Sequence, residues 1–354
     1  MSPVAPIPKK PVNNPRLSRL RVLCLVHTEF FDPADPNFLN VTPDTESEHA
    51  VTAGLKALQH DVCVLPFRAT PKELSSLGDE IARLKPDIVF NFIEHLDGDR
   101  RSAAEIPALL DQLGIPYTGA SANGTLAAID KAASKEAVSS VGFPVPSFVV
   151  VPRGAKGSRG TFDFPGIVKP QFGGASVGLT LASVVKSRQE LINRARDIHR
   201  KLDEPAICEQ YIEGRELSIG LVEDGKDILV LPIRETIFGR AAEGGPRFCT
   251  ERVKDNHGYR DRWGIHYERA QLSPALDRRI RTLCKNAFRV LDLSGYARID
   301  LRVNSTGDPV FLEANANPDL SPRYFGIMAS WMGLTYEDVL GKILRAGFNR
   351  TNGR

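Results

Sequence analysis

Short apolar runs alternate with amphipathic stretches over the first third of the chain. The apolar runs lie at residues 20–26, 61–66 and 87–92, and the helical patterns lie at residues 46–58, 74–84 and 103–113. Strands that alternate with helices predict a parallel sheet covered on both faces. Ligands of such sheets gather at the carboxyl ends of the strands. Two loops, 27–44 and 91–101, lie at such ends, and the second carries His95, a candidate ligand contact.

The rest of the chain continues to mix strands and helices. The pattern predicts one helix over 125–141 and another over 187–202, with strands at 147–151, 166–170 and 206–211. Further helices are expected near 273–291 and 336–346, between strands of the last third. The chain is therefore predicted to be of the α/β class.

One hairpin, formed by residues 297–303 and 309–315, carries polar side chains at alternating positions. The segment between its strands has turn chemistry, which predicts antiparallel pairing. A register that matches apolar side chains sets these positions opposite each other: Leu301 and Leu312, Asp300 and Glu313, Arg298 and Asn315. Opposed like charges destabilise a sheet, whereas a divalent cation with oxygen ligands would use them. A solvated outer face is the alternative, and the hairpin alone leaves both open.

A glycine-rich segment at 173–178 follows the strand that ends near Lys169. Backbone N–H groups of such a segment can wrap phosphate oxygens while the lysine supplies charge. The spacing matches neither a P-loop nor a dinucleotide fingerprint. A flexible hairpin without ligand is the alternative.

Composition limits the class of partner. A net charge of +3 over 354 residues gives no electrostatic case for nucleic acid or an anionic membrane. No apolar run is long enough to span a bilayer. The five cysteines are far apart and lack metal-ligand spacing, which is typical of reduced thiols in a cytoplasmic protein. The length predicts two or three domains.

Four signals follow one another in a specific order: Asp130-Lys131, Lys169 before the glycines, Glu209-x-x-Ile212-x-Gly-x-Glu216, and Arg298-Ile-Asp300 with Glu313-x-Asn315. In this order they resemble the ATP-grasp superfamily and, within it, the D-alanine–D-alanine ligase family. The resemblance covers residues 20–345. It is closest at 113–119, 129–135, 168–170, 296–300 and 312–315.

The resemblance implies a three-domain ATP-grasp architecture. It would consist of a Rossmann-like parallel-sheet domain at 20–125, a small central α+β domain at 126–208, and a C-terminal domain with an antiparallel sheet at 209–347. Residues 1–19 are rich in Pro, Asn and Lys and lack the apolar core of a signal peptide, so their composition predicts a disordered tail. ATP would lie between the last two domains, and the first domain would support a homodimer.

The resemblance also implies roles for single residues. Lys131 and Lys169 would contact the ATP phosphates under a loop that includes Gly174 and Ser176. The remaining nucleotide contacts would be Glu209 and Ile212 at the adenine, Glu216 at the ribose, and Tyr211. Asp300, Glu313 and Asn315 would hold two Mg²⁺ ions, or Mn²⁺ in their place.

Three catalytic roles follow from the same resemblance. Arg298 would stabilise the oxyanion, Lys254 would reach the γ-phosphate, and Glu48 would bind the ammonium group of the first substrate.

The substrate half departs from the family pattern. Ala175 replaces one of two loop serines, Asp319 stands at a glycine, and Tyr324 stands at a serine that binds a substrate carboxylate. With Glu48 and His95, Asp319 and Tyr324 are the candidate substrate contacts. We therefore predict an ADP-forming ligase that joins a carboxylate to an amine through an acyl phosphate, on amino acids or similar metabolites but not on two D-alanines. The alternatives are a genuine D-alanine–D-alanine ligase of peptidoglycan precursor synthesis and a silent ATP-binding regulator.

Overall fold

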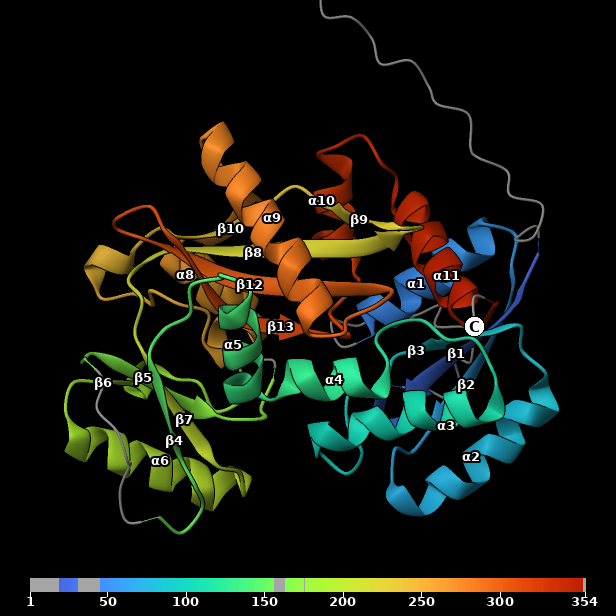
Figure 1. The fold of residues 1–354 in the computed structure, drawn as a ribbon, viewed down its shortest axis with the longest axis horizontal. Coiled ribbons are helices and arrows are strands. Elements are labelled where there is room, and N and C mark those ends of the chain that lie inside the picture. Colours follow the sequence, from blue (N-terminus) through green and yellow to red (C-terminus); the bar gives the residue numbers. More distant parts are fainter. Residues whose placement is uncertain (1–18, 31–44, 156–162, 175, 353–354) are drawn as a thin grey trace, which may run out of the picture.

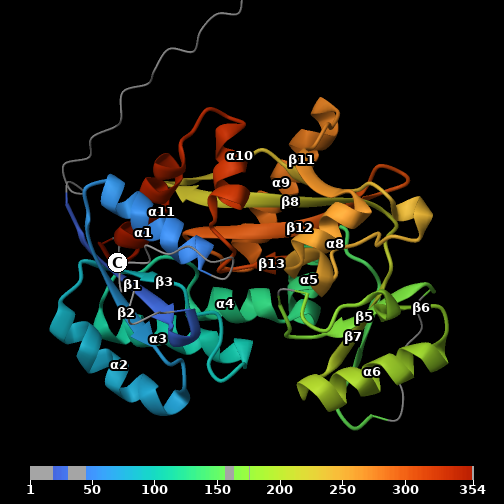
Figure 2. The same cartoon turned by 180° about the vertical axis from the view of Figure 1, so that it is seen from behind.

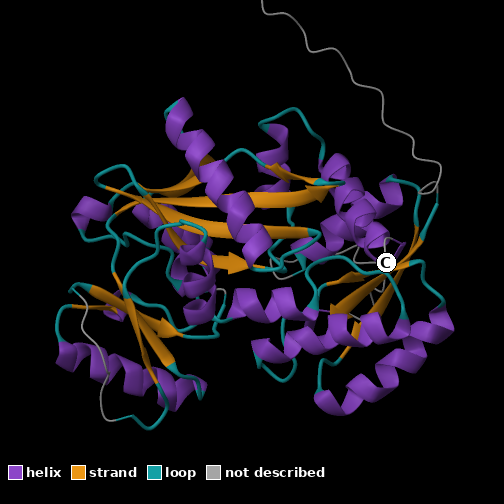
Figure 3. Ribbon diagram, viewed as in Figure 1, coloured by secondary structure: helices purple, strands orange, loops and turns teal. Residues whose placement is uncertain are grey.

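The computed structural model describes residues 19–30, 45–155, 163–174 and 176–352. These residues form three β-sheets with helices around them (Figure 1). Figure 3 distinguishes the strands from the helices by colour. The expected tail 1–19 lies almost wholly outside the described residues, as do Ala175 and most of loop 27–44.

The first sheet is parallel, with strand order β2 (Asp61–Phe67), β1 (Arg21–His27), β3 (Ile88–Asn91). Side chains of β1 alternate between two cores. One core contains α1 (Glu46–Ala57) and α11 (Tyr336–Asn352), and the other contains α2 (Pro71–Leu84) and α3 (Glu105–Leu113). The predicted parallel sheet with two covered faces is confirmed.

The second sheet is antiparallel, in the order β4 (Phe148–Val151), β7 (Ala206–Gln210), β5 (Gly166–Pro170), β6 (Val184–Val185). Helix α6 (Arg188–Leu202) packs its apolar side chains on one face of this sheet. Alternation along β5 and β7 therefore turns Lys169 and Glu209 to the opposite face.

The third sheet is also antiparallel, in the order β11 (Ile265–Arg269), β10 (Arg234–Phe238), β8 (Gly214–Asp224), β12 (Tyr296–Asn304), β13 (Pro309–Asn315), with β9 (Asp227–Val230) beside β8. Helix α9 (Pro274–Val290) covers its apolar face. Figure 2 shows the other side, with the short helices α8 (His257–Trp263) and α10 (Ile327–Ser330). A further short helix, α7 (Glu251–Asp255), precedes α8.

The predicted single helix over 125–141 is wrong, because two helices occupy this stretch. Helix α4 (Ala122–Ile129) ends just before Asp130, and α5 (Lys131–Ser140) begins just after it. Asp130 has an extended backbone, and its side chain accepts hydrogen bonds from the N–H groups of Ala132 and Ala133. An aspartate in this conformation is a helix N-cap, so it starts a new helix rather than continuing the old one.

The hairpin β12–β13 has most of the predicted register. Asp300 pairs with Glu313 and Arg298 with Asn315, as expected, but Leu301 pairs with Phe311 instead of Leu312. A bulge follows Asp300 and makes Leu312 the extra residue. The prediction failed here because Phe311 is fully buried and its ring packs against Phe143.

In the described part of the chain, no helix combines the length and the apolar composition that crossing a membrane requires.

Candidate active site

A cavity of about 870 Å³ lies where the second and third sheets meet helix α1 and the loop after β3. Its lining includes every candidate residue of the sequence analysis except His95. His95 instead lies on the loop after β3, where its ring is 5.1 Å from that of His27. The structure therefore does not bring His95 to the cavity wall.

The polar face of the third sheet forms one wall of the cavity. Facing positions run across four strands, from Arg234 to Ser218, then to Asp300, and finally to Glu313. A second row, from Thr236 to Glu216 and Arg302, runs parallel to it. Because directly paired residues share a face, these side chains lie on the same side, opposite the core under α9.

Arg298 and the two opposed carboxylates form the centre of this wall. The Nε of Arg298 donates to Asp300 Oδ2 at 3.0 Å. Burial disfavours the charge of Arg298, but Asp300, Tyr324 and Glu313 together outweigh burial and raise the pKa of the guanidinium. Burial also disfavours the charge of Glu313 and by itself would raise its pKa. Lys131, Lys169 and other cations nevertheless hold that pKa well below its usual range. Glu313 is therefore ionised at neutral pH.

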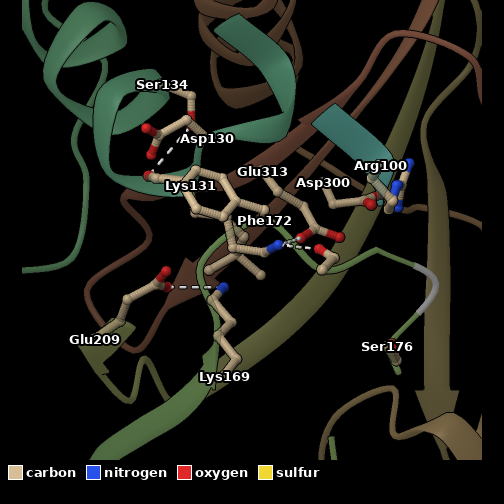
Figure 4. A network of polar contacts seen from close by, with 12 residues as sticks. Arg100, Asp130, Lys131, Ser134, Lys169, Phe172, Ser176, Glu209, Asp300 and Glu313 are labelled. Carbon is tan, nitrogen blue, oxygen red and sulfur yellow. Dashed lines mark hydrogen bonds and ion pairs between the residues drawn. The ribbon is translucent and has the colours of Figure 1, made fainter. Parts of the chain in front are cut away.

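Two lysines of the central part of the chain lie beside carboxylates of the cavity: Lys131 is near Glu313, and Lys169 contacts Glu209 (Figure 4). Lys131, the first residue of α5, donates to the carbonyl of Gly173 and lies 3.9 Å from Glu313 Oε2. Lys169 Nζ lies 3.0 Å from Glu209 Oε2. Burial lowers the pKa of Lys131 to about 8, whereas Glu209 and other carboxylates offset burial at Lys169 and raise its pKa.

Sequence reasoning missed Lys135, which holds Glu209 from the other side. Its Nζ lies 2.8 Å from Glu209 Oε1 and donates to the carbonyl of Leu312 at 2.6 Å. Lys135 is fully buried and shares the face of α5 with Lys131, one turn away. That i, i+4 spacing was the signal available in the sequence.

The glycine-rich loop is tied to the segment that carries Lys254. Ser176 Oγ donates to the carbonyl of Cys249 at 3.0 Å, and the N–H of Gly178 donates to Glu251 at 3.2 Å. Gly174 lies so close to the Arg100 guanidinium that a Cβ there would collide with it. Lys254, on α7, lines the cavity, and its charge is one of those that lower the pKa of Glu313.

Arg302 is a second residue that sequence reasoning missed. It is 3% exposed, and its Nη2 donates to Glu216 Oε2 at 2.7 Å. Its Nη1 donates to the carbonyl of Ile212 and to the hydroxyl of Tyr211. Arg302 therefore arranges three of the predicted nucleotide contacts. Its place two residues after Asp300, on the same strand face, was the signal available in the sequence.

Three of the four substrate candidates, Glu48, Asp319 and Tyr324, line the cavity. Burial raises the pKa of Glu48 to about 7, and the carboxylates of Glu94 and Asp319 add to the effect. Asp319 accepts hydrogen bonds from the N–H and hydroxyl of Ser321, so its carboxylate is turned into its own loop. The ring of Tyr324 lies 5.4 Å from the Arg298 guanidinium carbon.

This chain is similar to known proteins in sequence and in fold. The family model described as D-ala D-ala ligase C-terminus matches residues 137–345. A D-alanine–D-alanine ligase of Cupriavidus necator is 30% identical, over 87% of this chain and 94% of its own length. An uncharacterized protein, y4sG of Sinorhizobium fredii, is 29% identical over 78% of both chains.

Two solved structures have the same fold. One is the D-alanine–D-alanine ligase of Bacillus anthracis complexed with ATP, with a TM-score of 0.68 and 19% identity over 94% of this chain and 99% of its own. The other is the VanG D-Ala:D-Ser ligase of Enterococcus faecalis, with a TM-score of 0.68 and 18% identity over 92% and 98%. Taken with the family model and the curated relatives, they show that this chain belongs to the D-alanine–D-alanine ligase family and is an ADP-forming ATP-grasp ligase.

Proposed function

We propose that this ligase uses ATP to join the carboxylate of one small molecule to the amine of another, on amino acids or amino-acid-like metabolites. The observation that carries the proposal is the arrangement around Arg298. This buried arginine lies beside Asp300, which pairs with Glu313, while Lys131 and Lys169 face the same carboxylates. A protein that only bound nucleotide would not need an arginine at this point.

The chemistry follows from these charges. A carboxylate is a poor electrophile, and transfer of the γ-phosphoryl group converts it to an acyl phosphate. Lys131, Lys169 and Lys254 offset the charge of the transferring group. When the amine attacks, Arg298 stabilises the oxyanion that develops on the acyl carbon, and phosphate leaves. The loop around Gly174 and Ser176 would exclude water that hydrolyses the intermediate.

The two carboxylates suit Mg²⁺. The Oδ1 of Asp300 is buried without a hydrogen-bond partner among the described residues, although it is an acceptor. The described part of the chain contains no group of three His, Cys, Asp or Glu side chains suited to a metal. The metal ligands would therefore be the carboxylates of Asp300 and Glu313 together with the amide of Asn315. When bound there, the ions would neutralise phosphate charge.

Glu48 supports an amino-acid substrate. It is buried, it forms no ion pair with a described residue, and two further carboxylates lie near it. A buried carboxylate among others favours a cation beside it, and the ammonium group of an amino acid supplies one.

Several expectations remain proposals alongside this one. They are the domain boundaries after residues 125 and 208, the homodimer, the cytoplasmic location, and small molecules as the only partners.

The test is a screen for ADP release with Mg-ATP and pairs of amino acids and small carboxylates. We expect release that depends on both members of a pair. Release that needs no amine, or ATP binding without any turnover, would contradict the proposal and favour the silent regulator. Turnover of D-alanine alone would favour the activity named for the curated relatives.

A further inference from the structure

Arg234, the first residue of β10, is enclosed by two tyrosine rings. Its guanidinium carbon lies 3.7 Å from the ring centroid of Tyr267 and 4.0 Å from that of Tyr324. Rings stack on the faces of a guanidinium and leave its N–H groups at the edges, because all its donors lie in one plane. The stack therefore fixes the orientation of Arg234 but accepts no hydrogen bond from it.

These edge donors lack an acceptor within the described part of the chain. Arg234 is 7% exposed, its buried Nε has no partner there, and no ion pair with a described carboxylate forms. The neighbouring arginines on the same sheet face differ, because Arg298 pairs with Asp300 and Arg302 with Glu216. A buried charge without a counter-charge costs free energy, which an anionic ligand would offset.

An anion bound to Arg234 would lie close to Arg298 and Asp300, where the reaction is proposed to occur. Arg234 pairs with Ser218, and Ser218 pairs with Asp300. Adjacent strands are roughly 5 Å apart, so the backbone of Arg234 is about 10 Å from that of Asp300. Tyr324 contacts Arg234 on one side and approaches Arg298 on the other. A small molecule can therefore bridge Arg298 and Arg234 along the wall of the cavity.

We propose that Arg234 binds a carboxylate of the amine substrate and so restricts the ligase to amines that carry one. The proposal rests on the ligase function proposed above. A guanidinium edge presents two parallel N–H groups that match the two oxygens of a carboxylate. Tyr324, whose ring adds bulk where the family pattern has a small hydroxyl, then contributes by holding the arginine. The substrate class is free amino acids rather than simple amines.

The experiment compares amines that differ only in the carboxylate. ADP release is measured with Mg-ATP, a panel of small carboxylates, and three amine pairs: alanine and ethylamine, phenylalanine and phenethylamine, histidine and histamine. We expect the wild-type protein to use the carboxylated member of the active pair at least tenfold better, in kcat/KM.

Two substitutions at Arg234 carry the test. Arg234→Met should raise the KM for the carboxylated amine roughly 10- to 100-fold, the loss typical of a charge-assisted contact, with the KM for ATP within twofold. The rate with the decarboxylated amine should not change. The KM of Arg234→Lys for the carboxylated amine should lie between those of the parent and Arg234→Met, because lysine keeps the charge but lacks the two parallel N–H donors of the guanidinium. Arg278→Met, which removes a charge from the exposed side of α9, is the matched control and should behave as the parent.

Two results would overturn the proposal: equal use of both members of a pair by the wild-type protein, or an equal loss with both members in Arg234→Met. The second result would show that the cation only supports the fold. Absence of ADP release from every pair would contradict the ligase function itself, so the two failures are distinguishable.

Discussion

Glu313 is surrounded by positive charge and lies opposite a second carboxylate. Lys131, Lys169, Lys254 and Arg298 all lower its pKa, against the effect of burial. A carboxylate that attracts this many cations serves the charge of a ligand rather than the fold, because the fold supplies it with no hydrogen bond from a described residue.

We predict that Glu313→Gln abolishes ADP release while the protein remains folded. The amide keeps the shape but loses the charge that would hold Mg²⁺ and orient Lys131. Turnover at saturating Mg-ATP and circular dichroism are the two measurements. Glu136→Gln, an exposed change on α5, is the control. Activity equal to the parent would rule out the role in metal binding.

Glu48 should give the reaction a pH dependence. Its pKa is raised to about 7 in the ligand-free protein, and only the ionised form attracts an ammonium group. The kcat/KM for an amino-acid substrate should therefore fall as the pH drops through 7. Glu48→Gln should have low activity at every pH and should not show this fall in kcat/KM near pH 7. If the variant kept the fall in kcat/KM near pH 7, another titrating group would be responsible for it.

The same shift predicts an effect on stability. The folded-state pKa of Glu48 lies above its ordinary value of 4.5, so its contribution is fully present below about pH 4.5 and is lost as the pH rises through about 7. Glu48→Gln should therefore raise the Tm of the ligand-free protein, relative to the parent, above pH 7 but not at pH 4. The exposed Glu80→Gln should show no such difference.

Among the elements, the break between α4 and α5 matters most for the site. Asp130 caps α5 and also accepts a hydrogen bond from Gln171 Nε2 at 2.9 Å, next to the glycine-rich loop. The cap therefore aims Lys131 at Gly173 and Glu313. In a continuous helix, the direction of the Lys131 side chain would instead be set by the helical repeat that begins at α4.

We predict that Asp130→Ala destabilises the protein by about 1 kcal/mol, as the loss of an N-cap does, and also weakens ATP binding. Ser121→Ala removes the comparable cap of α4, which accepts from the N–H of Gly124. This control should cost similar stability but leave ATP affinity unchanged. Urea unfolding and calorimetric titration with ATP separate the two effects. Equal ATP affinity in both variants would show that the cap does not orient Lys131.

For the molecule as a whole, the substrate end of the cavity combines parts from distant segments. Helix α1 contributes Glu48, the loop after β13 contributes Asp319, and Tyr324 follows on a short π-helix, Pro322–Gly326. Their charge and bulk differ from a site built for a small amino acid. The nucleotide end, in contrast, keeps every predicted side chain at the cavity wall.

We therefore predict that the protein, given Mg-ATP and D-alanine alone, releases phosphate no faster than its substrate-free background. Tyr324 is too large, and its hydroxyl too far from the backbone, to bind a carboxylate as a short hydroxyl would. A phosphate assay and chromatography of the products check the prediction. Stoichiometric D-alanyl-D-alanine at millimolar substrate would show that the protein is a genuine D-alanine–D-alanine ligase.

Local patterns were enough to predict much of this molecule. Alternation along β12 and β13 predicted that Asp300 faces Glu313, because strand geometry has a period of two and pairing needs only a short turn. Alternation of strands with helices predicted the parallel sheet for the same kind of reason. The order of the lysines, glycines and carboxylates pointed to the family, since phosphate chemistry needs these residue types together.

Contacts between distant segments determined the rest. The bulge at Leu312 depends on Phe143 filling the space beside Phe311, and the pairing of Lys135 with Glu209 joins residues 74 positions apart. The enclosure of Arg234 needs Tyr267 and Tyr324, which come from different elements. A periodic pattern reports which face a side chain occupies. It cannot report which remote side chain will meet it there, because packing and burial settle that only when the whole chain has folded.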